Sequence, residues 1–215
     1  MYALSRFLHV LVFVYWLGGD LGAFVASYFV TDPNRPVGER GVALNILSLV
    51  DAAPTATLLL TLPTGVLLAQ NAGWWHPPGV LVPVLILMSV VWVPMALVLH
   101  FDGARRRHLG AIDRALRVVL IAALVATAGG TLLGAWPALA VPHFIAAKCL
   151  LLAAATACGL ALRTPLARFV AEMGLGTQAR QSELRHQMTM CRAWVIGIWC
   201  CLLLAAGLGI VRPTL

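Results

Sequence analysis

The sequence predicts an all-α, polytopic membrane protein, a bundle of six transmembrane helices. Of its 215 residues, 61% are hydrophobic and only 11% are charged, and the mean hydropathy is +0.91. This composition excludes an ordinary soluble domain. Six apolar runs of about 17 residues or more, each interrupted by at most one or two ionisable groups, are long enough to cross a bilayer. We therefore expect a single transmembrane domain over residues 1–215, embedded in a lipid bilayer.

The first apolar run predicts a helix over about residues 4–30. It ends at Thr31-Asp-Pro-Asn-Arg-Pro, where two prolines stop a helix. The run is too long for a cleaved signal peptide and contains His9 and Asp20, so we expect a membrane helix there instead.

The second helix is expected over about 42–70 and the third over about 80–101. Pro54 and Pro63 fall inside the second helix, but the threonines around them can bond the carbonyl groups that proline leaves unpaired. A continuous helix is therefore expected. The connector between the two helices holds a tryptophan pair, which suits the lipid headgroup zone.

The last three helices are expected over about 114–136, 141–162 and 193–211. A polar segment over about 164–191 precedes the last of them. The apolar residues of this segment fall on one helical face, which predicts a short amphipathic helix lying on the cytoplasmic membrane surface; they are Leu166, Phe169, Val170 and Met173.

Arginine distribution predicts the orientation. Two arginines lie in or beside the first loop, five beside the third and five beside the fifth, whereas only Arg6 and Arg212 lie on the other side. The positive-inside rule then places both termini outside and the odd loops in the cytoplasm. The membrane is expected to be a bacterial-type inner membrane. The net charge of +7 is explained by these topology signals, and we expect no nucleic-acid partner.

One face of the first helix carries polar groups. His9, Trp16 and Asp20 lie at positions i, i+7 and i+11, so they share a line along the helix, with His9 and Asp20 about 16 Å apart. Lipid cannot solvate a histidine and a carboxylate, so this face is expected to look into the protein interior.

Three histidines are expected near the outer side. His9 and His143 lie at matched depth in the first and fifth helices, roughly 4 to 8 Å inside the boundary, and His76 lies in an outer loop. Two such histidines can ligate a b-type haem between the helices, with Lys148 or Arg6 pairing with a propionate. The alternative is that His9 and His143 bond only to backbone or lipid headgroups.

The pattern His9-x6-Trp16-x-Gly18-Gly19 resembles the opening helix of a superfamily of membrane proteins. This superfamily contains CopD-type copper-resistance proteins, HemJ-type protoporphyrinogen oxidases and the membrane domain of bacterial urate oxidase. A helix with an outer histidine followed by Lys148 also looks like a late helix of these proteins. The resemblance implies haem bound through His9, or copper handling as in the CopD branch. The length of the chain leads us to expect no cytochrome c domain of a complete urate oxidase.

Two carboxylates, Asp20 and Asp51, are expected near the middle of the membrane on adjacent helices. An intramembrane carboxylate marks a proton path, a counter-ion or a buried polar cluster, and a pair between Asp20 and Lys148 is the structural alternative. His100 with Arg105 and Arg106 forms a candidate inner site for an anionic ligand, although arginines at a helix end more often anchor to anionic lipid.

The sequence thus predicts a membrane b-type haem protein that works in electron transfer or in a membrane oxidoreductase reaction with a redox partner or quinone. His9 and His143 are the expected axial ligands and metal-binding residues, with His76 in reserve. Trp16 and Phe13 are expected to pack the porphyrin, and Gly19 to let a neighbour approach. The alternatives are a copper or small-ion transport and resistance protein of the CopD type, and a haem-free membrane scaffold.

Overall fold

The computed structural model describes residues 1–102, 106–173 and 181–211 of the chain. Within these residues it has six helices long and apolar enough to span a membrane, and no strands, which confirms the predicted all-α class. The helices are α1 (Tyr2–Thr31), α2 (Val37–Asn71), α3 (Leu81–Phe101), α4 (Arg106–Leu132), α5 (His143–Met173) and α6 (Gln181–Val211), with a short 3-10 helix η2 (Pro137–Leu139) before α5.

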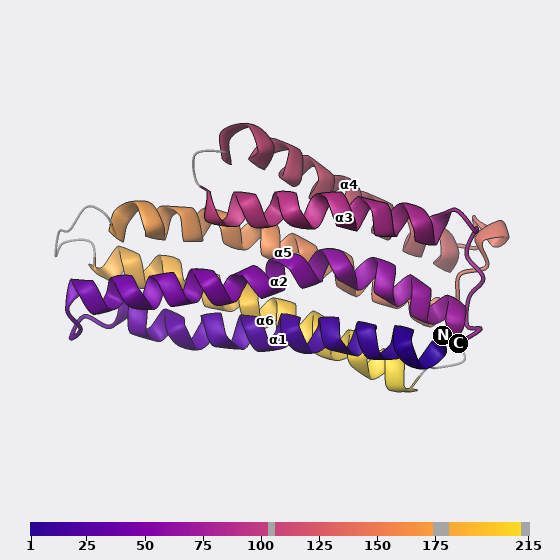
Figure 1. Ribbon diagram of the computed structural model, residues 1–215, viewed down its shortest axis with the longest axis horizontal. Helices are drawn as coiled ribbons and strands as arrows, with labels where there is room; N and C mark the ends of the chain where they lie inside the picture. Colours follow the sequence, from indigo (N-terminus) through magenta and orange to yellow (C-terminus); the bar gives the residue numbers. More distant parts are fainter. Residues whose placement is uncertain (103–105, 174–180, 212–215) are drawn as a thin grey trace.

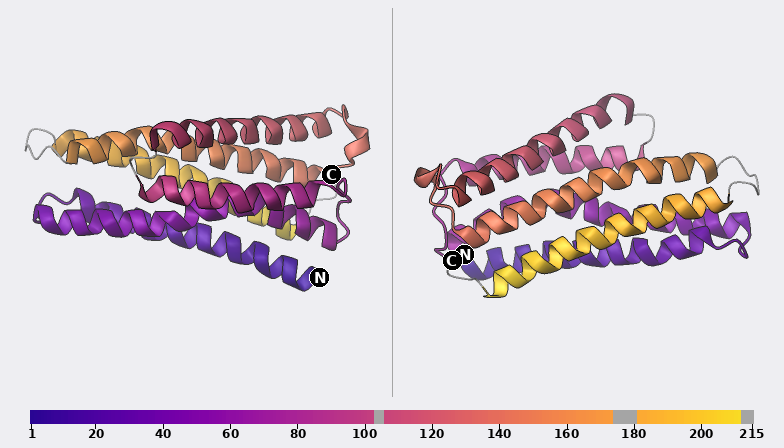
Figure 2. Two further views of the ribbon diagram at one scale, coloured as in Figure 1. Left: turned by 45° about the horizontal axis from the view of Figure 1, so that its top comes forward. Right: turned by 180° about the vertical axis from the view of Figure 1, so that it is seen from behind.

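The helices run up and down along the long axis of the molecule (Figures 1 and 2). Each helix packs against the next one in the chain, and α6 returns to α1, so the bundle forms a ring in chain order. The α3–α4 contact is the smallest in this ring. We call the end where α1 begins and α6 ends the terminal end, and the end that holds Thr31 and Val37 the distal end.

The α1–α2 contact depends on Gly19. A Cβ atom placed on Gly19 would lie 2.4 Å from Cδ of Pro54 and 3.2 Å from the carbonyl oxygen of Val50. Because proline has no N–H, Pro54 leaves the Val50 carbonyl, four residues earlier, without its helical donor. The missing side chain at Gly19 lets α1 approach this carbonyl closely. A glycine at this position therefore admits a neighbouring helix, while the predicted part of Gly19 in a cofactor site stays a prediction.

A side chain of another helix replaces the hydrogen bond that the second proline of α2 removes. Pro63 removes the N–H that would bond the Leu59 carbonyl, and the Ser89 hydroxyl of α3 donates to that carbonyl instead, at 3.1 Å. Threonines within α2 also donate to carbonyls four residues earlier, for example Thr57 to Ala53 at 2.8 Å. As expected, α2 runs through both prolines as one helix.

Two arginines bond the last turn of α1 at the distal end. Arg192 of α6 donates to the Ser27 hydroxyl at 2.8 Å and to the Ser27 carbonyl at 2.9 Å. Arg40 of α2 donates to the Val30 carbonyl at 2.8 Å. The last carbonyls of a helix lack internal donors and carry partial negative charge, so cationic donors stabilise this end. These bonds join α1 to both of its neighbours in the ring.

The segment 164–191 differs from the prediction. Instead of a separate helix on the membrane surface, α5 continues to Met173 and α6 already begins at Gln181. The physical reason is that the apolar face of this segment packs inside the bundle, where Phe169 is fully buried. It contacts a distal cluster that includes Val30, Leu47 and Met188. The segment is amphipathic, but other helices of the protein cover its apolar face.

Helix α4 also begins earlier than expected, at Arg106 instead of residue 114. The sequence analysis predicts that this helix starts at about residue 114. Asp113 and Arg117 are therefore inside the helix, and both side chains are buried.

Replacing Gly19 by alanine is expected to destabilise the protein by about 1–3 kcal/mol, because the new methyl group overpacks the contact with Pro54 and Val50. Gly18→Ala is the matched control, since a Cβ atom there meets nothing within 4 Å. Unfolding of the two variants in mixed detergent micelles measures the difference. Equal stability of both variants would contradict this account of the α1–α2 contact.

Candidate functional site

A cavity of about 760 Å³ lies in the terminal half of the bundle and is lined by residues from all six helices. Small-molecule and cofactor sites in proteins have volumes of about 300–1,000 Å³. Most of the lining is apolar, which is the usual character of such sites. The polar lining residues that bear on its chemistry are Arg6, His9, Thr61, Lys148 and Cys149.

His9 lines this cavity, and its ring is held by α2. Its Nδ1 lies 3.0 Å from Oγ1 of Thr64. The Thr64 hydroxyl donates its own hydrogen to the Leu60 carbonyl at 2.7 Å, so toward His9 it acts as an acceptor. His9 must then carry its hydrogen on Nδ1, which leaves a lone pair on Nε2. This is the tautomer of a metal-ligating histidine that binds through Nε2.

The ring of His9 has room because a glycine lies beside it. A Cβ atom placed on Gly65 of α2 would lie 3.2 Å from Cε1 of His9. With a larger residue at position 65, the imidazole would have to shift by a few tenths of an ångström. Gly65 was not singled out from the sequence, because a lone glycine in a helix gives no such signal.

Two cationic side chains line the cavity, Arg6 of α1 and Lys148 of α5, and none of the described lining residues is acidic. Lys148 lies against α6, where a Cβ atom on Gly209 would be 2.7 Å from its Nζ. Its charge lies within electrostatic range of His9. Among the described residues, Lys148 forms no ion pair, and so none with Asp20. The cavity thus favours an apolar ligand that carries negative charge.

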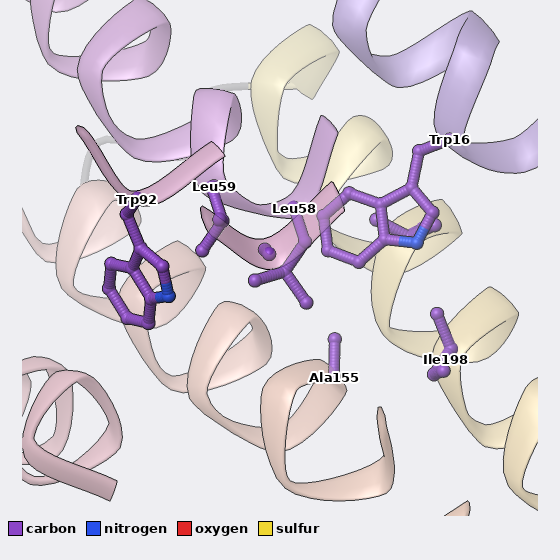
Figure 3. Close-up of a cluster of buried hydrophobic side chains, with 8 residues drawn as sticks. Trp16, Leu58, Leu59, Trp92, Ala155 and Ile198 are labelled. Carbon is purple, nitrogen blue, oxygen red and sulfur yellow. The ribbon is translucent and has the colours of Figure 1, made fainter. Parts of the chain in front are cut away.

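A layer of buried apolar residues borders the cavity on its distal side. Figure 3 shows the side chains of this layer. Trp16 of α1 and Trp92 of α3 lie on either side of Leu58 and Leu59 of α2 in this layer. We call it the tryptophan layer; it consists of Trp16, Leu58, Leu59, Trp92, Ala96, Ala155, Ile198 and Leu202. Trp16 and the partly buried Phe13 next to the layer both line the cavity, while their predicted packing against a porphyrin stays a prediction.

The terminal end of the cavity is covered by connecting segments. Trp75 is buried there and donates from Nε1 to the Leu139 carbonyl of η2 at 2.8 Å. Trp74 packs edge-on against Phe144 of α5, with ring centroids 6.0 Å apart. Both tryptophans line the cavity, so they contribute to the site as well as to the end of the bundle.

The other predicted site residues lie elsewhere. His143, the first residue of α5, and His76, in the α2–α3 connection, are exposed, and neither lines the cavity. Gly19 belongs to the α1–α2 contact and does not line the cavity either. The structure therefore brings His9 together with Lys148, Trp16 and Phe13, but does not bring His143 to them.

The candidate inner site is only partly described. His100 lies near the distal end of α3, where its Nε2 donates to the Ser48 carbonyl of α2 at 2.7 Å. Its Nδ1 lies 4.0 Å from Oδ2 of Asp51. Arg105 and the side chain of Arg106 are outside the described residues, so an anion site built on them stays a prediction.

A buried charge cluster around Asp113 was missed by sequence reasoning. Its Oδ1 accepts from Trp92 Nε1 at 2.8 Å, and its Oδ2 accepts from Arg117 at 3.0 Å and Arg163 at 2.6 Å. The cluster joins α3, α4 and α5. Removing one member of such a buried group costs roughly 3–5 kcal/mol. The spacing of Asp113 and Arg117, four residues apart, was the available signal, but the helix was predicted to start only at about residue 114.

A second, smaller pocket lies outside the ring of helices, close to His9. Its volume is about 390 Å³, its lining is almost entirely apolar, and it is formed by α1, α2 and α3. Thr64 lines this pocket while its hydroxyl bonds His9. Thr64 therefore lies between the outer pocket and the site.

No family model matches this chain, and comparisons with curated proteins and with solved structures give no match. What the site binds must therefore be inferred from its own residues. Within the described ranges, no group of three or more His, Cys, Asp or Glu side chains could hold a metal ion.

Proposed function

We propose that this protein binds b-type haem in the 760 Å³ cavity, with His9 as an axial ligand, and that it works in membrane electron transfer or a membrane oxidoreductase reaction. The observation that carries the proposal is the bond between His9 Nδ1 and Thr64, because it leaves Nε2 with a lone pair in an apolar cavity.

The residues of the cavity fit the chemistry of haem. Haem is a flat apolar ring with two propionate carboxylates, and the cavity combines apolar and aromatic walls with two cations and no acidic lining residue in the described chain. Lys148 and Arg6 would hold the propionates. Trp16 and Phe13 would pack against the ring. When bound, haem supplies one-electron redox chemistry whose potential depends on the axial ligand and on burial.

The protein's own residues orient the ligand and exclude water. Thr64 fixes the tautomer and the ring plane of His9, and Gly65 leaves room for that plane. The tryptophan layer closes the cavity on the distal side, and Trp75 helps to close the terminal side. A buried site of this kind keeps bulk water from the iron ligand and tunes the redox potential.

The second axial position is left open by this proposal. His143 was the expected partner of His9, but its side chain is exposed and does not line the cavity. We propose that His9 alone is required for haem binding. His143 remains a prediction as a ligand, and it would have to turn inward to serve.

We also propose that the terminal end faces the outside of a bacterial-type inner membrane. Support comes from the arginines near the distal end, such as Arg35, Arg168 and Arg185, since positive charge accumulates on the cytoplasmic side. The site would then open nearer the outer face, where a quinone or another redox partner in the membrane could reach it.

The first prediction concerns His9. The detergent-purified protein is expected to show a b-type absorption spectrum, oxidised and reduced, with about one haem per chain by pyridine haemochrome. His9→Ala is expected to lose the haem, because the axial ligand is gone. His76→Ala, at an exposed position that does not line the cavity, is the matched control that should keep it. A colourless wild-type protein, or full haem in His9→Ala, would reject the proposal; bound copper without a Soret band would favour the copper alternative.

The second prediction concerns Thr64. Thr64→Val removes the acceptor for His9 Nδ1 with little change in volume, so we expect about 10- to 100-fold weaker haem retention. The midpoint potential of the remaining haem should rise, since the imidazole becomes a weaker electron donor. Thr61→Val is the control: Thr61 lines the same cavity and also bonds a carbonyl four residues earlier, but does not touch His9. Identical behaviour of the two variants would contradict the role of Thr64.

A further inference from the structure

Three titratable side chains lie together on the distal side of the tryptophan layer, outside the haem site proposed above. They are Asp20 of α1, Asp51 of α2 and His100 of α3. Asp20 follows Trp16 by about one helical turn, and His100 follows Trp92 by about two. The cavity lining includes none of the three.

Asp20 is the most enclosed member. Its exposed fraction is 4%, and its Oδ2 atom has no hydrogen-bond partner among the described residues. A carboxylate inside a membrane protein is costly unless it is protonated or paired. Asp20 has no ion pair in the described part of the chain. The Trp16 side chain hydrogen-bonds to it, and the Asp51 carboxylate acts on it electrostatically. Asp20 and Asp51 follow Gly19 and Val50, which meet at the close α1–α2 contact. Two neighbouring carboxylates can avoid this cost by holding a proton between them.

Asp51 and His100 connect Asp20 to the outside of the ring. The exposed fractions of their side chains are 28% and 16%, compared with 4% for Asp20 as a whole residue. The Ser48 carbonyl can only accept, so His100 carries a hydrogen on Nε2, and Nδ1 faces Asp51 at 4.0 Å. A single water can bridge this distance.

Two further groups lie near Asp51 without forming an ion pair with it in the described part of the chain. Arg163 of α5 acts electrostatically on Asp51, but its guanidinium is already bonded to Asp113 at 2.6 Å. The Cys191 thiol of α6 is also within electrostatic range of Asp51. No lysine or arginine of the described chain forms an ion pair with Asp20 or Asp51, which distinguishes them from Asp113.

We propose that Asp20, Asp51 and His100 form a proton-binding site, in which the two carboxylates hold one exchangeable proton that enters and leaves through His100. A proton passes from water to Nδ1 of His100 and on to a carboxylate oxygen of Asp51, from which it is shared with Asp20. Only O–H and N–H bonds form and break, and no electron is transferred. The site does not depend on what the cavity binds.

Infrared difference spectroscopy of the full-length protein in lipid, after steps of pH in H₂O and D₂O, tests this proposal. The expected result is the carbonyl-stretching band of a protonated carboxylic acid, shifted to lower frequency in D₂O. Asp20→Asn should lose this band or shift it. Asp32→Asn is the matched control, because this half-exposed carboxylate pairs with Arg35 and should leave the band unchanged. Circular dichroism verifies that each variant is folded.

His100→Gln keeps a side-chain donor for the Ser48 carbonyl but removes the titratable nitrogen. The band should persist in this variant, while its exchange into D₂O slows. The same measurement keeps the proposal testable if Asp20→Asn fails to fold. A wild-type protein without the band, a band that survives in Asp20→Asn, or unchanged exchange in His100→Gln would overturn it. A band that responds to added sodium at constant pH would also overturn it, in favour of a metal-cation site.

Discussion

Inside a bilayer, every backbone carbonyl and every charged side chain must find its partner within the protein, and this constraint explains how the helices of this bundle meet. In α2, two prolines each leave a backbone carbonyl without its helical N–H donor. Helix α1 packs closely against the Val50 carbonyl at Gly19, and the Ser89 hydroxyl of α3 donates to the Leu59 carbonyl. The same constraint applies to side chains, since Asp113 is surrounded by Trp92, Arg117 and Arg163. These particular contacts between helices lie where polar groups would otherwise be left unsatisfied.

These contacts divide the bundle along its axis into parts with different chemistry. Near the terminal end is a cavity with cations and a histidine whose tautomer is fixed by Thr64. The tryptophan layer separates it from the carboxylates and His100. Beyond them, a second apolar cluster and the arginine bonds to the end of α1 close the distal end. Because apolar side chains screen charge weakly, a change of charge in one part can act on the other across this layer.

The fold class, the six spans and the inward face of α1 could be predicted from the sequence, because hydropathy and helical period depend only on local residues. What the sequence could not supply was non-local. The expected depth of His143 matches that of His9, but depth does not tell which way a side chain points, and His143 does not line the cavity. Its role as a ligand stays a prediction. The face that carries Phe169 was assigned to a membrane surface because sequence cannot distinguish lipid from a neighbouring helix. The roles of Thr64 and Gly65 depend on their contacts with His9 of another helix, which cannot be predicted from the spacing of residues in the sequence.

The ring order of the helices has a consequence for biogenesis. Each helix can dock on its predecessor as soon as it leaves the ribosome and enters the membrane, because chain neighbours are neighbours in space. The ring closes only when α6, the last of the six helices to be made, reaches α1 and Arg192 bonds Ser27. Since α6 supplies one wall of the cavity, the pocket is incomplete until this helix has entered the membrane and packed. Any cofactor would therefore be loaded only after all six helices have assembled.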